Sequence, residues 1–339
     1  MLMRPLMNYQ ILVKCFIVVS TLFAFIGCND VIQQEKFLPE STGSVNQVIV
    51  VTTDTIWKGG VGDSIRKYFA APLEASTIAE PEFTLTYLPQ PIWKGAITKS
   101  RNVLYVLTDT LEAAHIKKNL YARPQNIAVV KSKDLENLKN NLFKVAATAK
   151  YIFRETELEL AQARFLKSLS SKALFDERLG FSLRLPSIYQ LGVDQDGFLW
   201  YDRPVEGGTI NLMAYSLEKG YFADRDSFLD QILGLRDSIG KKYVPGPDVP
   251  GAVTYMISER TFAPYVRPTE VGGFKAVEVK GIWEVQNYPM AGPYLMYLVN
   301  DTINKRTVVL EGFTFAPSKP KRDFMFELEA IMKSIEITE

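Results

Sequence analysis

Residues 274–285, "FKAVEVKGIWEV", alternate between apolar and charged side chains, and this alternation indicates the architecture of the second half of the chain. A β-strand points successive side chains to opposite faces, so residues two apart share a face. One face carries Val277, Val279, Trp283 and Val285, and the other carries Glu278, Lys280 and Glu284. The pattern predicts a strand with one buried face, which is typical of an antiparallel sheet.

The residues that follow predict two more strands and a closing helix. Residues 294–300, "YLMYLVN", and 306–316, "RTVVLEGFTFA", flank a turn near residues 301–305. Residues 324–337, "FMFELEAIMKSIEI", space their apolar side chains with the period of an amphipathic helix.

The residues upstream extend the same sheet. Residues 189–202, "YQLGVDQDGFLWYD", predict a hairpin, because Asp196-Gly197 is a favoured two-residue turn pair. A strand over 209–217 and a helix over 226–243 follow. An antiparallel sheet with a few helices indicates the α+β class.

The first half of the chain has a different pattern, with strand and helix segments in alternation. The predicted strands are 47–53, 82–88, 101–108 and 126–132, and a helix is expected over 61–73. Asp109, with Glu112 three residues later, resembles a capping box. We therefore expect a short helix that contains His115, the single histidine, and ends before Pro124.

A long helix is predicted between the two halves. Ser132 can cap it, and its apolar period continues to about residue 170 without glycine or proline. We therefore predict two α/β sandwich-type domains, an N-terminal one over 47–131 and a mainly antiparallel C-terminal one over 173–339. The long helix, residues 132–172, joins them.

The N-terminus has the features of a signal peptide. Arg4 and Lys14 precede the apolar run 15–27, "CFIVVSTLFAFIG", which has the length of a signal-peptide core but is short for a bilayer span. Gly27 directly before Cys28 resembles the lipobox of bacterial lipoproteins, in which the signal is removed and the cysteine is acylated. The alternatives are a plain signal anchor or a buried N-terminal helix.

Removal of residues 1–27 would leave Cys28 as the first residue of the mature protein. Cys15 is the only other cysteine, so neither a disulfide nor a cysteine nucleophile is expected. Acyl chains such as palmitate on Cys28 would hold the protein at a membrane, since each buried methylene contributes about 0.8 kcal/mol. Residues 28–46 are mostly polar and predict a tether between lipid and fold.

Several motifs together resemble a known family, domain of unknown function 4837, whose members are lipoproteins of Bacteroidota. They are "VVTTDTIWKGGVGDSIRKYF", "EPEFTLTYL", "SRNVLYVLTD", "RDSIG", "GIWEVQNYPMAGPYLMY" and "EGFTFAPSKPKRDFMFELEAI", in that order. The resemblance extends over nearly the whole predicted mature chain. It implies a lipoprotein of the cell envelope, in the outer membrane facing the periplasm, and supplies no activity.

The element order of residues 179–337 is also similar to PsbP-like and Mog1-like domains. Those domains are α/β/α sandwiches that mostly serve as assembly or binding modules. The similarity implies a binding role for the C-terminal half.

No motif predicts catalytic, cofactor-binding or metal-binding residues. The glycine loop at 59–62 lacks the third glycine of a dinucleotide fingerprint and the Lys-Ser/Thr of a P-loop. Asp194 and Asp196 begin like a calcium loop, but the later ligands are missing. With a net charge of +1, nucleic acid is not an expected partner, and Lys319, Lys321 and Arg322 are expected to decorate a helix start.

One segment suits recognition. Trp283, Tyr288, Met290 and Tyr294 cluster around prolines and a glycine, and aromatic residues with methionine favour binding of a protein or ligand. The alternative is that they complete the core.

Two functions remain open. The first is a non-catalytic binding module with an envelope protein or ligand as partner. The second is an envelope hydrolase that uses paired carboxylates, which a pocket with two acidic side chains of raised pKa would favour.

Overall fold

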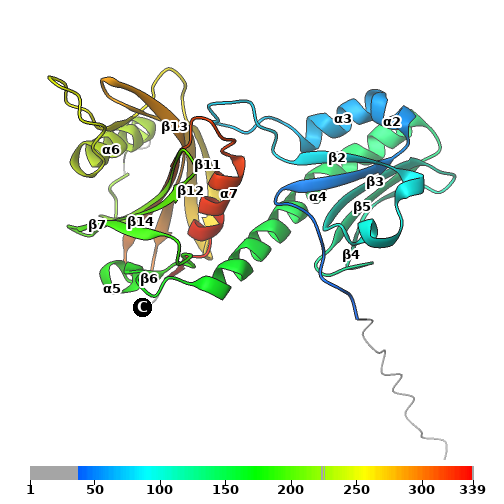
Figure 1. Cartoon of the computed structure of the whole chain (residues 1–339), viewed down its shortest axis with the longest axis horizontal. Coiled ribbons are helices and arrows are strands. Elements are labelled where there is room, and N and C mark those ends of the chain that lie inside the picture. The colour runs from blue at the N-terminus through cyan, green and yellow to red at the C-terminus, as the bar shows by residue number, and fades with distance from the viewer. Residues whose placement is uncertain (1–36, 223, 225, 338–339) are drawn as a thin grey trace, which may run out of the picture. The chain divides into compact units, whose positions relative to one another are not determined.

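The computed structural model describes residues 37–222, 224 and 226–337, and the predicted signal peptide and Cys28 lie outside this part (Figure 1). Residues 39–339 form one compact unit. It contains a five-stranded sheet from the first half of the chain and an eight-stranded sheet from the second half. The α+β class predicted from the sequence is confirmed.

The N-terminal sheet has the order β2-β1-β3-β5-β4, and only β4 runs antiparallel to its neighbour. Its strands are β1 (Gln47–Thr52), β2 (Thr84–Pro89), β3 (Asn102–Thr108), β4 (Ala113–Lys118) and β5 (Asn126–Ser132). The helices of this half are α2 (Asp54–Lys58), α3 (Gly60–Phe69) and the short 3₁₀ helices η1 (Gln90–Ile92) and η2 (Gly95–Lys99). The apolar residues of α3 and of the long helix α4 (Leu135–Phe165) cover one face of the sheet.

The predicted helix after Asp109 is wrong, because residues 113–118 form the edge strand β4. Pairing with β5 overrides the local capping signal, and the Glu112 carboxylate accepts hydrogen bonds from Ser132 and Asn141 rather than capping a helix. His115 therefore lies on an exposed strand position.

The long helix α4 (Leu135–Phe165) is present and continues into η3 (Leu166–Ser168). Its cap is Asp134, whose side chain accepts a hydrogen bond from the Asn137 amide at 2.8 Å, and not Ser132 as predicted. The Ser132 hydroxyl instead donates a hydrogen bond to the Glu112 carboxylate, so the helix begins after Asp134.

The C-terminal sheet has the order β10-β12-β13-β14-β9-β8-β7, with β11 also paired to β12, and all of these pairs are antiparallel. The strands are β7 (Gln190–Gln195), β8 (Phe198–Val205), β9 (Gly208–Glu218), β10 (Met256–Ser258), β11 (Tyr265–Val271), β12 (Phe274–Val285), β13 (Tyr288–Asp301) and β14 (Arg306–Phe315). The remaining elements are α5 (Phe175–Leu179), β6 (Phe181–Ser182), α6 (Phe228–Tyr243), α7 (Arg322–Met332) and β15 (Glu336–Ile337).

Helices α6 and α7 cover opposite faces of this sheet (Figure 1). Alternate residues of β12 and β13 therefore enter two different cores. Val279, Trp283 and Met296 pack with α6, whereas Ala276 and Leu295 pack with α7. The predicted alternation of 274–285 is confirmed, but the expectation of one buried face is wrong, because both faces are covered and Glu278 is buried on the α7 side. The Asp196-Gly197 turn is also confirmed, and both of its residues have positive φ.

Residues 39–46 belong to the folded unit and not to a tether, which corrects the sequence prediction for them. Thr42 exchanges backbone hydrogen bonds with Lys99 and Arg101 at 3.0 and 2.8 Å, and the Arg123 amide donates to the Pro39 carbonyl at 2.9 Å. The polar composition suggested a linker, but neighbouring segments supply hydrogen-bond partners for the backbone of residues 39–46.

Candidate functional site: a charged cavity beside helix α7

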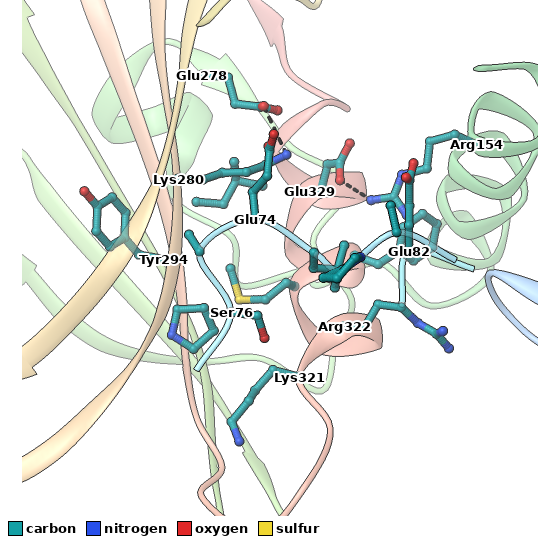
Figure 2. Close-up of a pocket in the computed structure, with 18 of the residues that line it drawn as sticks. Glu74, Ser76, Glu82, Arg154, Glu278, Lys280, Tyr294, Lys321, Arg322 and Glu329 are labelled. Atoms are coloured by element: carbon teal, nitrogen blue, oxygen red, sulfur yellow. Dashed lines mark hydrogen bonds and ion pairs between the residues drawn. The ribbon is translucent and has the colours of Figure 1, made fainter. Parts of the chain in front are cut away.

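A cavity of about 490 Å³ lies where the loop over residues 71–76 meets the α7 side of the C-terminal sheet (Figure 2). Helix α4, the strands β11, β12 and β13, and helix α7 contribute the other side chains. The volume is within the range of small-molecule sites. We refer to it as the charged cavity, because six basic and four acidic side chains line it: Lys150, Arg154, Arg267, Lys280, Lys321 and Arg322, and Glu74, Glu82, Glu278 and Glu329.

The start of α7 is fixed by a residue far away in the sequence. The Glu80 carboxylate accepts hydrogen bonds from the backbone amides of Lys321 and Arg322 at 2.7 and 2.8 Å. Negative charge at a helix N-terminus is stabilising, and these amides have no partner within the helix. Glu80 therefore attaches the 71–82 loop to the start of α7.

Five of the six basic side chains are neutralised by carboxylates. Lys150 pairs with Glu82 at 2.5 Å, Arg154 with Glu329, Lys280 with Glu278 at 3.1 Å, and Arg322 with Asp323 at 2.9 Å, while Arg267 bonds both Glu74 and Glu278. Figure 2 shows the pairs Glu278–Lys280 and Glu329–Arg154 close together on one side of the cavity.

Glu329 is ionised although it is buried. Burial by itself would raise the pKa of this carboxyl, but the charges of Arg154, Lys333 and Lys280 outweigh burial and bring its pKa to about 2. The Arg154 contact comes from α4, 175 residues earlier in the chain. Glu329 therefore acts as a fixed negative charge that holds α4 against α7.

Glu278 behaves in the same way. Its burial would raise the pKa, but Lys280 and Arg267 lower it below the usual value of 4.5. The Tyr297 hydroxyl also donates a hydrogen bond to Glu278 at 3.0 Å. The pKa of this hydroxyl is raised well above its usual range, mainly by burial and further by the nearby charges of Glu329 and Glu278.

These two carboxylates do not form the acid–base pair that glycoside chemistry requires. Such a pair needs one carboxyl with a raised pKa that stays protonated and donates its proton. Both Glu278 and Glu329 have lowered pKa values and are held by cations. The arrangement suits electrostatic binding better than proton transfer.

Lys321 is the exception among the basic side chains of the charged cavity. It is 4% exposed, and its ammonium donates to the Lys319 carbonyl at 2.9 Å. Among the described residues, no carboxylate lies within ion-pair distance of this ammonium. It lies apart from the Glu278–Lys280–Glu329 group in Figure 2. A buried charge without a counter-ion is costly.

The four residues of the predicted recognition segment do not form one surface. Trp283 and Tyr294 are each 2% exposed and belong to the core under α6. Met290 is half-buried, and only Tyr288 is exposed, at 39%. The segment is a hairpin between β12 and β13, turning at Asn287, and not a crossover, so alternation sends its aromatic rings inward.

Tyr294 is placed at the edge of the charged cavity, but its ring turns away from the charged side chains (Figure 2). The ring packs under the Arg236 guanidinium at 3.5 Å on the α6 side. Cys28, the predicted lipidation site, lies outside the described residues.

The glycine loop after β1 has a packing role. A Cβ on Gly62 would lie 1.9 Å from the Trp57 carbonyl oxygen, so only glycine lets α3 start against α2. Within residues 37–222, 224 and 226–337, no group of three or more His, Cys, Asp or Glu side chains could hold a metal ion. No helix in that same part of the chain is long and apolar enough to cross a membrane.

Sequence reasoning missed Lys321, Arg154 and Glu329 as site residues. Lys321 was expected to decorate a helix start, because nothing local tells a buried lysine from an exposed one. For Glu329 a signal existed: it neighbours Leu328 on the apolar face predicted for the closing helix, and a carboxylate there must find a cation.

Solved structures with similar parts include a crystal structure from Bacteroides thetaiotaomicron, 15% identical, covering 48% of this chain and 46% of that one, with a TM-score of 0.28. A STAR-related lipid transfer protein fragment from Xanthomonas axonopodis is 14% identical and covers 43% of this chain and 96% of its own, with a TM-score of 0.22. Human StAR-related lipid transfer protein 5 is 11% identical, and the match covers 53% of this chain and 94% of that protein's chain, with a TM-score of 0.24. No curated protein matches the sequence.

Two family models match, and they meet at the end of α4. Residues 41–166 match a Domain of unknown function (DUF8532), and residues 168–334 match a Domain of unknown function (DUF4837). The DUF4837 match covers a shorter part of the chain than the sequence motifs suggested, because the motifs before α4 lie in the DUF8532 match. The resemblance to domain of unknown function 4837 inferred from the sequence is therefore confirmed for residues 168–334.

Proposed function

We propose that the protein is a lipid-anchored binding protein of the cell envelope that holds a small anionic ligand in the charged cavity. Cys28 would carry the lipid, such as palmitate, and the folded part would face the periplasm from the outer membrane. The sequence pattern around Gly27 and Cys28 supports the anchor. Mass spectrometry of the natively expressed protein tests it, and an intact leader or an unmodified residue 28 would contradict it.

The observation that carries the binding role is the buried ammonium of Lys321. The other five cations of the charged cavity already have carboxylates, so only Lys321 can gain a counter-ion without breaking a pair. Leu73, Leu295 and Met325 supply apolar lining to the charged cavity. The ligand class is therefore an anion that also carries an apolar group.

This arrangement favours binding over the alternative of a carboxylate hydrolase. A binding module needs an unsatisfied charge and a fixed shape, both of which Lys321 and the surrounding ion pairs offer. A hydrolase of the expected kind would need a protonated carboxyl, whereas Glu278 and Glu329 have lowered pKa values.

The test uses 1-anilinonaphthalene-8-sulfonate as the anionic probe and N-phenyl-1-naphthylamine, which lacks the sulfonate, as its neutral counterpart. Lys321→Met should weaken binding of the sulfonate roughly tenfold to a hundredfold, since a charge-assisted hydrogen bond contributes about 1.5–3 kcal/mol. Binding of the neutral probe should not change. Fluorescence titration measures both dissociation constants.

Lys319→Met is the matched control, because Lys319 is two residues away and pairs with Glu206 on the surface. It should leave the affinity for the sulfonate unchanged. Lys321→Met should also melt no lower than the wild type in the absence of probe, since it removes an uncompensated buried charge. Equal affinities in wild type and Lys321→Met, with both proteins folded by circular dichroism, would overturn the anion site.

A further inference from the structure

A second pocket, of about 370 Å³, lies on the opposite face of the C-terminal sheet, beyond the end of α6. We call it the aromatic pocket. Its lining is mostly aromatic and apolar and includes Trp200, Trp283, Phe313, Phe315 and Met290. No lining residue is basic, and Asp202 is the only titratable one.

The floor of the aromatic pocket is built of packed rings. The Trp283 ring meets Phe313 at 5.6 Å and Phe315 at 6.3 Å between centroids, at steep angles of 73° and 60°. Gly292 makes room for the indole, because a Cβ there would lie 2.9 Å from the Trp283 Nε1 and 2.2 Å from the Thr314 carbonyl oxygen. Trp283 and Phe313 are buried, while Trp200, Phe315 and Met290 are half-buried.

The wall opposite is a proline loop that is fixed in place. The Gly246 amide donates to the Thr254 carbonyl at 3.0 Å, and the Thr254 hydroxyl donates to the Pro247 carbonyl at 2.5 Å. Gly246 also lies against Val285, where a Cβ would approach to 2.5 Å. The pocket is therefore preformed, which lowers the entropic cost of binding.

The polar groups of the aromatic pocket differ in whether they have partners within the protein. Asn211 is engaged, since its Oδ1 accepts from the Trp200 indole at 3.2 Å and its amide donates to Thr209 at 3.0 Å. Asp202 is half-buried, and no cation within the described residues forms an ion pair with it. The pocket can therefore attract a cation in two ways: the carboxylate forms an ion pair with it, and the faces of the four aromatic rings attract it through cation–π contacts.

We infer that the aromatic pocket binds an organic ammonium cation with a compact apolar body. Asp202 supplies the counter-charge and the half-buried Trp200 supplies an aromatic face, while the remaining apolar lining buries the hydrocarbon. An anion would meet the Asp202 charge with no compensating cation. A neutral hydrocarbon would leave that carboxylate partly desolvated and unpaired, which is costly.

The test compares phenyltrimethylammonium with tert-butylbenzene, which has the same shape without the charge. The chain has four tryptophans, so indole N–H resonances of protein labelled with ¹⁵N-tryptophan form a simple spectrum. Phenyltrimethylammonium should shift the Trp200 and Trp283 signals and leave those of Trp57 and Trp93, which lie in the N-terminal half, unchanged. Its affinity should exceed that of tert-butylbenzene at least tenfold.

Asp202→Asn should weaken binding of the cation about tenfold and leave tert-butylbenzene binding unchanged. Asp230→Asn, at an exposed position of α6, is the matched control and should have no effect. Three outcomes would overturn the inference: equal affinities for the two probes, unchanged cation affinity in a folded Asp202→Asn variant, or shifts at Trp57 or Trp93 alone. The outcome does not depend on the charged cavity, because Lys321 does not line this pocket.

Discussion

The charged cavity and the aromatic pocket share strands β12 and β13 yet have opposite chemistry. Glu278 and Lys280 of β12 line the first, and Trp283 and Val285 of the same strand line the second. Because successive side chains of a strand point to opposite faces, one strand supplies a charged wall under α7 and an apolar floor under α6. The comparison teaches that the polar residues of an alternating strand need not face solvent: here they form a site of their own.

The two faces also differ in how their ion pairs are buried. Under α6, Arg236 bonds Glu311 through two atoms, at 3.1 and 2.6 Å, and both are almost completely buried. Arg236 also donates to Ser258 at 2.7 Å. In the charged cavity, Arg267 is 47% exposed and shares Glu278 with Lys280. Solvent therefore screens the ion pairs of Arg267 more than the Arg236–Glu311 pair.

The largest effect is expected from Arg236→Met, which should lower the free energy of unfolding by roughly 3–5 kcal/mol because Glu311 is left as an uncompensated buried charge. Arg267→Met should lower it by less than about 1 kcal/mol, since solvent screens its pairs. Urea denaturation followed by circular dichroism measures both. Equal losses would remove the distinction between the two faces, and recovery of stability in Arg236→Met/Glu311→Leu would support it.

A smaller effect, specific to the charged cavity, is expected from Glu329→Gln. The folded pKa of Glu329 is about 2 and its usual value is 4.5, so its contribution is fully present above pH 4.5 and is lost as the pH falls towards 2. This difference corresponds to about 3 kcal/mol at neutral pH. Urea midpoints at pH 7 and pH 3 should therefore differ less in the variant than in the wild type.

The exposed Glu336→Gln variant is the control for this pH experiment, because its carboxylate is 66% exposed. It should follow the wild-type pH dependence. A Glu329→Gln protein that loses as much stability between pH 7 and pH 3 as the wild type would contradict a fixed negative charge at this position.

The smallest effect is expected from Tyr288→Ala on the exposed side of the hairpin. Surface substitutions usually change stability by no more than about 0.5 kcal/mol, and Tyr288 does not line either pocket. Thermal unfolding and the affinity for phenyltrimethylammonium should both be unchanged. A large loss of affinity would contradict this expectation and would show that the exposed side of the hairpin takes part in binding, as the sequence analysis suggested for Tyr288.

The sequence predicted local structure well where side-chain alternation was strong. Residues 274–285, the Asp196-Gly197 turn and the closing helix were all identified, because period and turn chemistry are local properties. The segment after Asp109 was misassigned, since the sequence AAHIKK has little strand character and becomes a strand only by pairing with β5. For the aromatic segment the sequence left recognition and core packing both open, and core packing holds for Trp283 and Tyr294.

Side-chain period and turn chemistry were enough to predict the α+β class and the two faces of β12, and the N-terminal pattern predicts lipidation of Cys28. Which charges meet depends instead on the tertiary fold. Arg154 lies 175 residues from Glu329, and Glu80 lies 241 residues from the Lys321 amide that it binds. The physical reason is that a residue's type and spacing fix which face it can occupy, whereas a counter-charge depends on the packing of distant elements.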